Sequence, residues 1–243
     1  MIMIKRLKAK RNDSVDYQRF KREMSLMLYM AMPRSKEVLC IGPRATDIDY
    51  DLRYRICEDV CQIMTDVLTE GMASWCLCVN PVSGSEVPFL FRPRKQAVKG
   101  FAITPMIIRS RDVGISRRSV RSLVKRLKHS ELPLQDMSLV RFIDDRAMMA
   151  DHWGYALGWR MSAPSAFTEP CILLNQCDRK ILAIKLCEVI QDAMNEALSK
   201  SGLADYKIEI PTYDREELET SRRLYVEGNL DEKTFGDLIN SDC

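Results

Sequence analysis

The sequence predicts an α+β fold, in which mixed helices and short strands form one compact unit or two closely packed subdomains. Hydrophobic residues make up 46% of the 243 positions, enough to bury a sizeable core. Segments with helical spacing of apolar residues alternate with short apolar runs that turn residues bound. No apolar run approaches the roughly 20 residues that cross a bilayer, so we expect a protein of the cytoplasm, the nucleus or both.

Helices are predicted where apolar residues recur every three or four positions. In the second of them, Ile56, Val60 and Ile63 follow this spacing and Gly71 closes the segment. The longest is expected to begin at Asp178 as its cap and to stop before Gly202. The predicted helices are residues 14–32, 50–68, 178–200 and two short ones within 215–240.

Strands are predicted at short apolar runs bounded by turn residues. The runs at 74–80 and 87–92 flank the turn sequence PVSGSE, so we expect them to form a hairpin. The run at 97–103 is expected to add a third strand. The other predicted strands are residues 36–42, 137–143, 170–176 and 206–211.

The expected domain organisation follows from these segments. Residues 1–13 form a basic leader that we expect to be flexible, and "KRLKAKR" within it fits a nuclear-import signal, an anion-binding arm or a solubilising tail. An α/β region at 14–132 then carries the basic segment 92–128, with a joint expected near 130–136. A β-containing region at 133–243 includes the long helix and acidic C-terminal helices.

Charge is segregated along the chain. From residue 92 to residue 128 there are twelve basic residues and a single acid, Asp112, whereas from residue 203 onward eleven acids oppose five bases. Such segregation marks a polyanion-binding surface or an acidic region for a protein partner. The candidate binding residues are the twelve bases of the first segment: Arg92, Arg94, Lys95, Lys99, Arg109, Arg111, Arg117, Arg118, Arg121, Lys125, Arg126 and Lys128.

The last six of these bases lie on a predicted helix that begins at Ser116. Its apolar positions, among them Val120, Leu123 and Leu127, form one stripe, and the basic residues occupy the rest of the surface. None of the bases has an acid four residues later, which weakens the interpretation of a salt-bridged surface helix. A helix that contacts phosphates and a merely solvated basic face both fit this pattern.

The same stretch resembles the second half of a helix-turn-helix. The turn glycine, the β-branched residue and the serine of that motif correspond to Gly114, Ile115 and Ser116. The resemblance implies a preceding helix over residues 104–111, capped by Thr104, and it covers only about twenty residues. It departs from the motif at Arg109, where an apolar residue is expected.

An Asp-x-Asp pair offers an enzyme alternative. Asp47 and Asp49 follow a predicted strand and Gly42, which resembles the metal-binding signature of nucleotidyltransferases. Two such carboxylates can hold Mg²⁺ against a triphosphate. Pro43 stands where that signature has a serine, and the segment after Asp49 is helical instead of a strand. Asp49 and Asp51 have a simpler explanation at the N-terminus of the following helix, where carboxylates cap amides and interact with the positive end of the helix dipole.

Cysteine and histidine do not form a recognisable metal or catalytic pattern. The nine cysteines contain no C-x-x-C pair, which fits a reducing compartment and free thiols. We expect Cys76 and Cys78 to point to opposite faces and to serve as core residues. His129 and His152 belong to no catalytic pattern, and the aromatic cluster at 153–159 fits a core anchor better than a base-stacking platform. No cofactor and no metal site are expected.

The sequence therefore favours a non-enzymatic, nucleic-acid-binding protein that contacts RNA or DNA phosphates through its basic segment. Its methionine-rich and glycine-poor composition is compatible with a viral origin. The acidic C-terminal helices are then available to a protein partner. The first alternative is a viral matrix-like structural protein that binds an anionic membrane or a nucleoprotein. The second alternative is the nucleotidyltransferase-like enzyme. Oligomeric state is not specified by any of these features.

Overall fold

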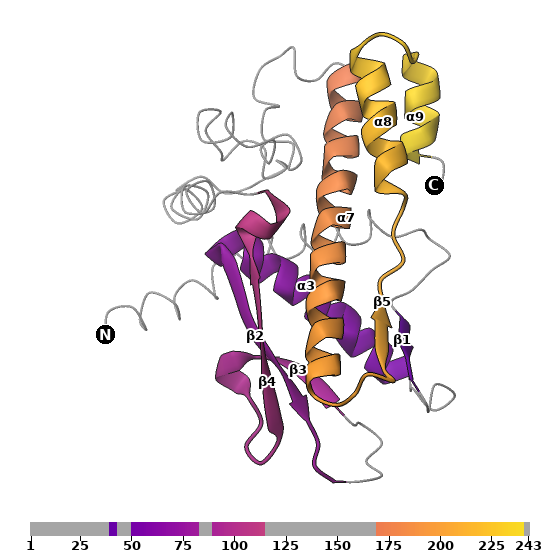
Figure 1. Ribbon diagram of the computed structural model, residues 1–243. Helices are drawn as coiled ribbons and strands as arrows, with labels where there is room; N and C mark the ends of the chain where they lie inside the picture. Colours follow the sequence, from indigo (N-terminus) through magenta and orange to yellow (C-terminus); the bar gives the residue numbers. More distant parts are fainter. Residues whose placement is uncertain (1–38, 43–49, 83–88, 115–168, 241–243) are drawn as a thin grey trace, which may run out of the picture.

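A computed structural model describes residues 39–42, 50–82, 89–114 and 169–240, and it confirms the α+β class (Figure 1). Among these residues, no helix has both the length and the apolar character needed to cross a membrane. The segments 1–38, 43–49, 83–88, 115–168 and 241–243 lie outside the described residues. The predicted helix at 14–32 and the predicted strand at 137–143 therefore stay predictions.

Helix α3 (Tyr50–Glu70) confirms the helix predicted from the apolar spacing at 50–68. Its apolar residues Ile56, Val60 and Ile63 are fully or almost fully buried. The helix ends where Gly71 adopts a φ of 75°, a left-handed conformation that suits glycine after a helix.

The predicted hairpin is confirmed by β2 (Met72–Val79) and β3 (Phe89–Pro93), which pair antiparallel with Leu77 opposite Phe91. The third strand, β4 (Ala102–Arg109), begins later than the predicted one and pairs antiparallel with the other side of β2. The strand order is thus β3-β2-β4. Pro105 lies on β4, where an edge position tolerates a residue without a backbone N–H.

The helix expected at 104–111 from the helix-turn-helix resemblance is wrong. Residues 104–109 are extended in β4, followed by a short 3-10 helix η2 (Ser110–Val113). Met106 and Ile108 are buried while Ile107 and Arg109 are exposed, which is the two-residue period of a half-buried strand. This period, and the β-branched residues, decide against a helix.

The sheet has one face toward the helices and one face away from them. On the helix side, the Trp75 indole N–H donates to Asp66 of α3 over 2.8 Å, and Thr104 lies 2.6 Å, oxygen to oxygen, from Ser201. The opposite side is called the second face here. Register and alternation assign it these residues: Met72, Ser74, Cys76 and Cys78 of β2, Leu90 and Arg92 of β3, and Ile103, Pro105, Ile107 and Arg109 of β4.

The connection between β3 and β4 crosses the second face. Both strands run antiparallel to β2, on either side of it, so residues 94–101 must return along β2 from the level of Trp75 to the level of Val79. This connection, called the crossover below, begins with the short 3-10 helix η1 (Arg94–Gln96). In Figure 1 it lies on the left of the sheet, whereas α7 lies on the right.

Helix α7 (Glu169–Lys200) is nine residues longer at its start than predicted. The strand expected at 170–176 is wrong, because this apolar run continues the helical spacing and buries Leu173 and Cys177 one turn apart. Asp178 is therefore an interior residue of the helix and not its cap. The predicted stop is confirmed, with Gly202 at a φ of 76°.

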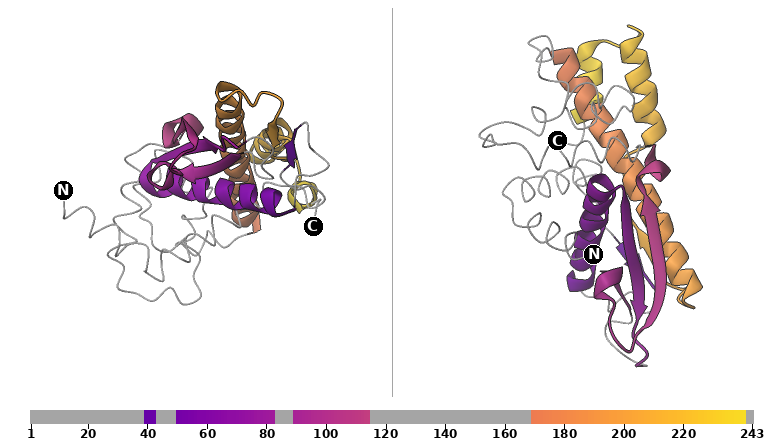
Figure 2. Two further views of the ribbon diagram at one scale, coloured as in Figure 1. Left: turned by 90° about the horizontal axis from the view of Figure 1, so that it is seen from below. Right: turned by 90° about the vertical axis from the view of Figure 1, so that its left-hand side faces the viewer.

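The C-terminal half of α7 packs against the sheet, and the helix extends beyond the sheet to α8 (Arg215–Val226) and α9 (Glu232–Asn240), as Figure 1 and the right-hand view of Figure 2 show. These two helices confirm the short pair predicted within 215–240. Tyr225 of α8 stacks on Phe235 of α9 with ring centroids 4.2 Å apart.

Strands from distant parts of the chain pair beside this core. β1 (Leu39–Ile41) runs antiparallel to β5 (Lys207–Glu209), with Cys40 opposite Ile208. Buried residues of α3, the sheet, α7, α8 and α9 form one continuous hydrophobic cluster. The described parts of the two predicted regions, 14–132 and 133–243, therefore share a single core.

Candidate functional site

The structure describes six of the twelve candidate cations, and five of them belong to the second face or its crossover. Arg92 and Arg109 lie on the strands of this face, and Arg94, Lys95 and Lys99 lie on the crossover. We call these five residues the cationic surface. Arg111 follows in η2. The remaining candidates lie outside the described residues: Arg117, Arg118, Arg121, Lys125, Arg126 and Lys128.

The cationic surface spans a distance suited to several phosphates. Arg92 and Pro105 are both opposite Cys76, and Arg109 is four residues farther along β4. At about 3.3 Å per residue and about 4.8 Å between strands, the backbones at Arg92 and Arg109 are roughly 16 Å apart. This length corresponds to about five base steps of a duplex.

Three of these cations have no acidic partner for their side chains among the described residues. Within the described part of the chain, no carboxylate oxygen lies within 4.0 Å of the side-chain nitrogens of Arg94, Lys99 or Arg109. The acid nearest in sequence, Asp112, accepts the backbone N–H of Arg109 over 2.8 Å and lies 3.8 Å from Nε of Arg111. All three residues are exposed, so their charge faces solvent, and no carboxylate of the described residues compensates it.

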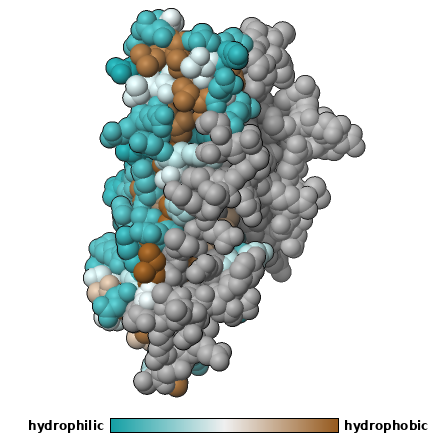
Figure 3. Space-filling view, turned by 90° about the vertical axis from the view of Figure 1, so that its right-hand side faces the viewer, coloured by the Kyte–Doolittle hydropathy of each residue, from teal (hydrophilic) through white to brown (hydrophobic). Residues whose placement is uncertain are grey.

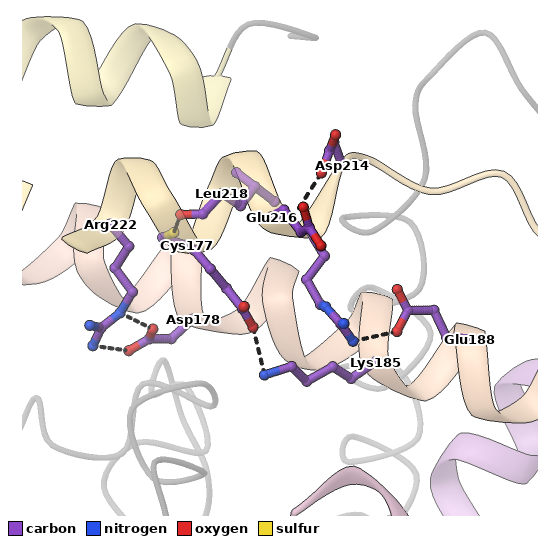
Figure 4. Close-up of polar contacts among 10 residues, drawn as sticks. Cys177, Asp178, Lys185, Glu188, Asp214, Glu216, Leu218 and Arg222 are labelled. Carbon is purple, nitrogen blue, oxygen red and sulfur yellow. Dashed lines mark hydrogen bonds and ion pairs between the residues drawn. The ribbon is translucent and has the colours of Figure 1, made fainter. Parts of the chain in front are cut away.

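Cations in the C-terminal half are arranged differently. Lys185 pairs with Glu219 at 2.7 Å, and Arg215 pairs with Glu188 at 2.6 Å, both between α7 and α8 (Figure 4). Exposed ion pairs at Lys200 and Lys207 follow the same pattern: Lys200 with Glu196 and Lys207 with Glu209. Lys185, Lys200, Lys207 and Arg215 are thus locally balanced, whereas exposed Arg223 and Lys233 of the same half have no carboxylate within 4.0 Å among the described residues. The second face is distinguished by gathering three such cations on one surface.

Arg92 is the most enclosed member of the cationic surface. Its guanidinium donates to the carbonyl of Phe91 over 3.2 Å and lies 3.9 Å from the Asp59 carboxyl of α3. Burial raises the pKa of Asp59 to about 7, although the Arg92 charge opposes that shift. Near neutral pH this carboxyl is therefore only partly ionised, and it balances Arg92 incompletely. Sequence reasoning did not find this pair, because Asp59 and Arg92 are far apart in the chain.

Apolar side chains accompany the cations on the second face. Ile103 is 49% exposed, Ile107 is 42% exposed and Met72 is 40% exposed. Aliphatic side chains beside cations offer dispersion contact as well as charge to a ligand. Sequence reasoning missed Ile107 because residues 104–111 were assigned to a helix, so the two-residue alternation of a strand was not applied to them.

The expectation that Cys76 and Cys78 diverge is wrong. They are two residues apart on one strand and so share a face, where their sulfurs lie 3.7 Å apart and both residues are fully buried. Cys57 and Cys61 belong to α3, on the other side of the sheet, so the four thiols do not converge. Within the described residues, no group of three or more histidine, cysteine, aspartate or glutamate side chains is placed to hold a metal ion.

The acidic C-terminal helices expose most of their carboxylates. Asp214 caps α8 by accepting the backbone N–H groups of Glu216 and Glu217. Figure 3 shows a mainly hydrophilic surface, with small hydrophobic patches, over the described residues on this side of the molecule. Exposed Val226, at 61%, is one of the apolar residues of these helices. A protein partner at these helices stays a prediction.

Several other predicted features lie outside the described residues. These are Asp47 and Asp49 of the Asp-x-Asp pair, His129, His152, the aromatic cluster at 153–159 and the basic leader. No protein-family model matches the chain, and no curated protein or solved structure shows significant similarity to it.

Proposed function

We propose that the chain is a nucleic-acid-binding protein without enzymatic activity, and that its second face and crossover contact RNA or DNA phosphates. The observation that carries this proposal is the group of exposed cations, Arg94, Lys99 and Arg109, that have no acidic partner in the described part of the chain. Like charges without local compensation cost stability unless a polyanion offsets them. The predicted basic helix after Gly114 would extend this surface.

Binding of this kind should fall steeply with salt. Each phosphate contact releases condensed counterions, so log K falls with log salt with a slope of about 0.9 per contact. If the basic segment as a whole neutralises about six phosphates, affinity should fall by roughly three orders of magnitude between 50 and 200 mM salt. Filter binding of RNA and DNA across this range measures the slope, and a flat response would contradict phosphate binding.

The triple variant Arg94→Gln, Lys99→Gln, Arg109→Gln tests the cationic surface itself. We expect nucleic-acid affinity to fall at least about tenfold and the salt slope to decrease by roughly 2 to 3, because up to three contacts are lost. The apolar core is unchanged, so the free energy of unfolding should shift only by tenths of a kcal/mol per site.

A matched control removes the same amount of charge elsewhere. Lys185→Gln, Lys200→Gln, Lys207→Gln also lowers the net charge by three, but these lysines are paired with carboxylates away from the second face. This control should bind almost as the parent does. Equal losses in the two triple variants would mean that only net charge matters and that the second face is not the binding surface.

A second candidate function is binding to an anionic membrane surface by a matrix-like protein. It is favoured by the exposed apolar residues Met72, Ile103 and Ile107 beside the cations, since interfacial binding combines apolar burial with attraction to anionic lipids. Binding to anionic liposomes should therefore be titrated alongside binding to RNA and DNA. If Ile103→Ser, Ile107→Ser abolishes liposome binding and nucleic acid does not bind the parent, this alternative replaces the first.

A further inference from the structure

The Cys76 and Cys78 thiols form a pair set apart from the hydrophobic core. Both lie on the second face of the central strand, with their sulfurs 3.7 Å apart, and the Cys76 thiol also approaches the carbonyl of Arg92 at 3.5 Å. Among the described residues, no α-helix lies over this face, where the crossover with its short helix η1 passes. Within the described part of the chain, the pair is covered by this one connection and by neighbouring side chains of the sheet.

Strand geometry argues against a disulfide between the two cysteines. Alternate residues of an extended strand have Cα atoms about 6.6 to 6.8 Å apart, whereas disulfides favour about 5.5 to 6 Å. The sulfurs would also have to approach from 3.7 Å to about 2.05 Å, which requires the central strand to distort. Both neighbours of that strand, β3 and β4, hold it in register.

An atom inserted between the sulfurs requires no such distortion. With metal–sulfur bonds of about 2.3 Å, two thiolates can bridge a metal at any sulfur separation up to about 4.6 Å. The observed 3.7 Å lies within this limit. Rotation of the two side chains can then adjust the angle at the metal while the backbone stays in place.

The ligand set selects the kind of metal. Within the described residues, no third histidine, cysteine or carboxylate joins the two sulfurs. Structural zinc requires four ligands, and calcium and magnesium require oxygen. Two soft thiolates, with no further ligand among the described residues, instead suit a thiophilic ion such as Cu(I).

We propose that Cys76 and Cys78 form a two-sulfur site for a thiophilic metal ion of the Cu(I) class. Two thiols and one Cu(I) give a bis-thiolate complex with a net charge of −1 and release two protons, with no change of oxidation state. The cation at Arg94, on the crossover, partly offsets that charge. The proposal is independent of nucleic-acid binding.

Proton release gives the site a pH dependence. Because the metal displaces protons from both thiols, its affinity should increase as the pH rises from 6 to 8.

A competition titration tests the site. The reduced full-length chain is titrated anaerobically with Cu(I) in the presence of a chromophoric Cu(I) chelator. We expect the parent to retain one equivalent, and Cys76→Ala or Cys78→Ala to weaken binding by about a hundredfold, since each ligand supplies a large share of the binding free energy. The control variant Cys57→Ala, Cys61→Ala removes two thiols one turn apart on α3 and should keep the parent's affinity.

X-ray absorption of the Cu(I)-loaded parent gives a measurement that does not depend on whether the variants fold. Two sulfur ligands are expected. Three or more sulfurs, or nitrogen and oxygen ligands, would overturn the proposal. It is also overturned if the parent retains no equivalent, or if folded Cys76→Ala, Cys78→Ala binds Cu(I) like the parent, because other thiols then hold the metal.

Discussion

Replacing Asp178 by alanine is expected to destabilise the folded chain by about 3 kcal/mol, because it leaves the Arg222 guanidinium without its partner in a partly enclosed position. Arg222 of α8 donates from Nε and Nη2 to the two carboxylate oxygens of Asp178 on α7 (Figure 4). The exposed side-chain fractions are 30% for Arg222 and 10% for Asp178. Since the arginine retains some solvent, we expect the low end of the cost of about 3 to 5 kcal/mol for breaking a buried pair.

The contribution of this pair to the free energy of unfolding is measured by urea unfolding of the parent, of the single variants Asp178→Ala and Arg222→Met, and of a double variant in which both partners are apolar. The double variant Asp178→Leu, Arg222→Met should lie close to the parent, since an apolar replacement of both partners removes the cost of burying charge. A loss of less than 1 kcal/mol in Asp178→Ala would mean that solvent compensates the arginine fully. The neighbouring Lys185→Gln, which breaks an exposed pair, should cost only about 0 to 1 kcal/mol.

This pair also shows why one part of the fold was not predictable. The run at 170–176 is apolar and only seven residues long, and periodicity does not separate a short buried strand from the start of a buried helix. The aspartate after it then has the residue type of a helix cap. Its actual partner, Arg222, is 44 positions away, and no local rule predicts such a contact.

Local signals did predict several elements. The 3.6-residue spacing from Ile56 onward predicted α3, turn residues predicted the β2–β3 hairpin, and Gly202 predicted the end of α7. The third strand was placed too early because residues 97–103 have the apolar composition of a strand, although most of them form the crossover around Gly100. The residues from Thr104 onward were assigned the 3.6-residue period of a helix, whereas they follow the two-residue period of a strand.

The candidate site was predicted in part by composition and not by geometry. Uncompensated charge identified the cations from Arg92 to Arg111, because the acid content of a segment is visible in the sequence. That five of them share the second face of one sheet, three of them on its crossover, follows from strand order, which the sequence does not specify. The same strand order encloses the Cys76 and Cys78 thiols.

The largest pH effect is expected at Asp59, where burial raises the carboxyl pKa from its ordinary value of 3.8 to about 7. The folded state then binds this proton more tightly than the unfolded state does. Its contribution to stability is complete below about pH 4 and is lost as the pH rises to about 7. A difference of roughly three pKa units corresponds to about 4 kcal/mol, and the 14% exposure of the side chain leaves little solvent to reduce it.

Urea unfolding between pH 4 and pH 8 tests this expectation with two variants of opposite effect. Asp59→Asn cannot ionise, so it should be more stable than the parent at pH 8 and should lack the fall in stability between pH 4 and 7. Arg92→Gln removes the attraction that opposes the shift, so the pKa of Asp59 should rise and the fall should continue above pH 7. If the parent and Asp59→Asn share one pH profile, the carboxyl ionises as freely in the folded chain as in water. The ion pair with Arg92 would then, despite its 3.9 Å separation, be screened like an ordinary surface pair.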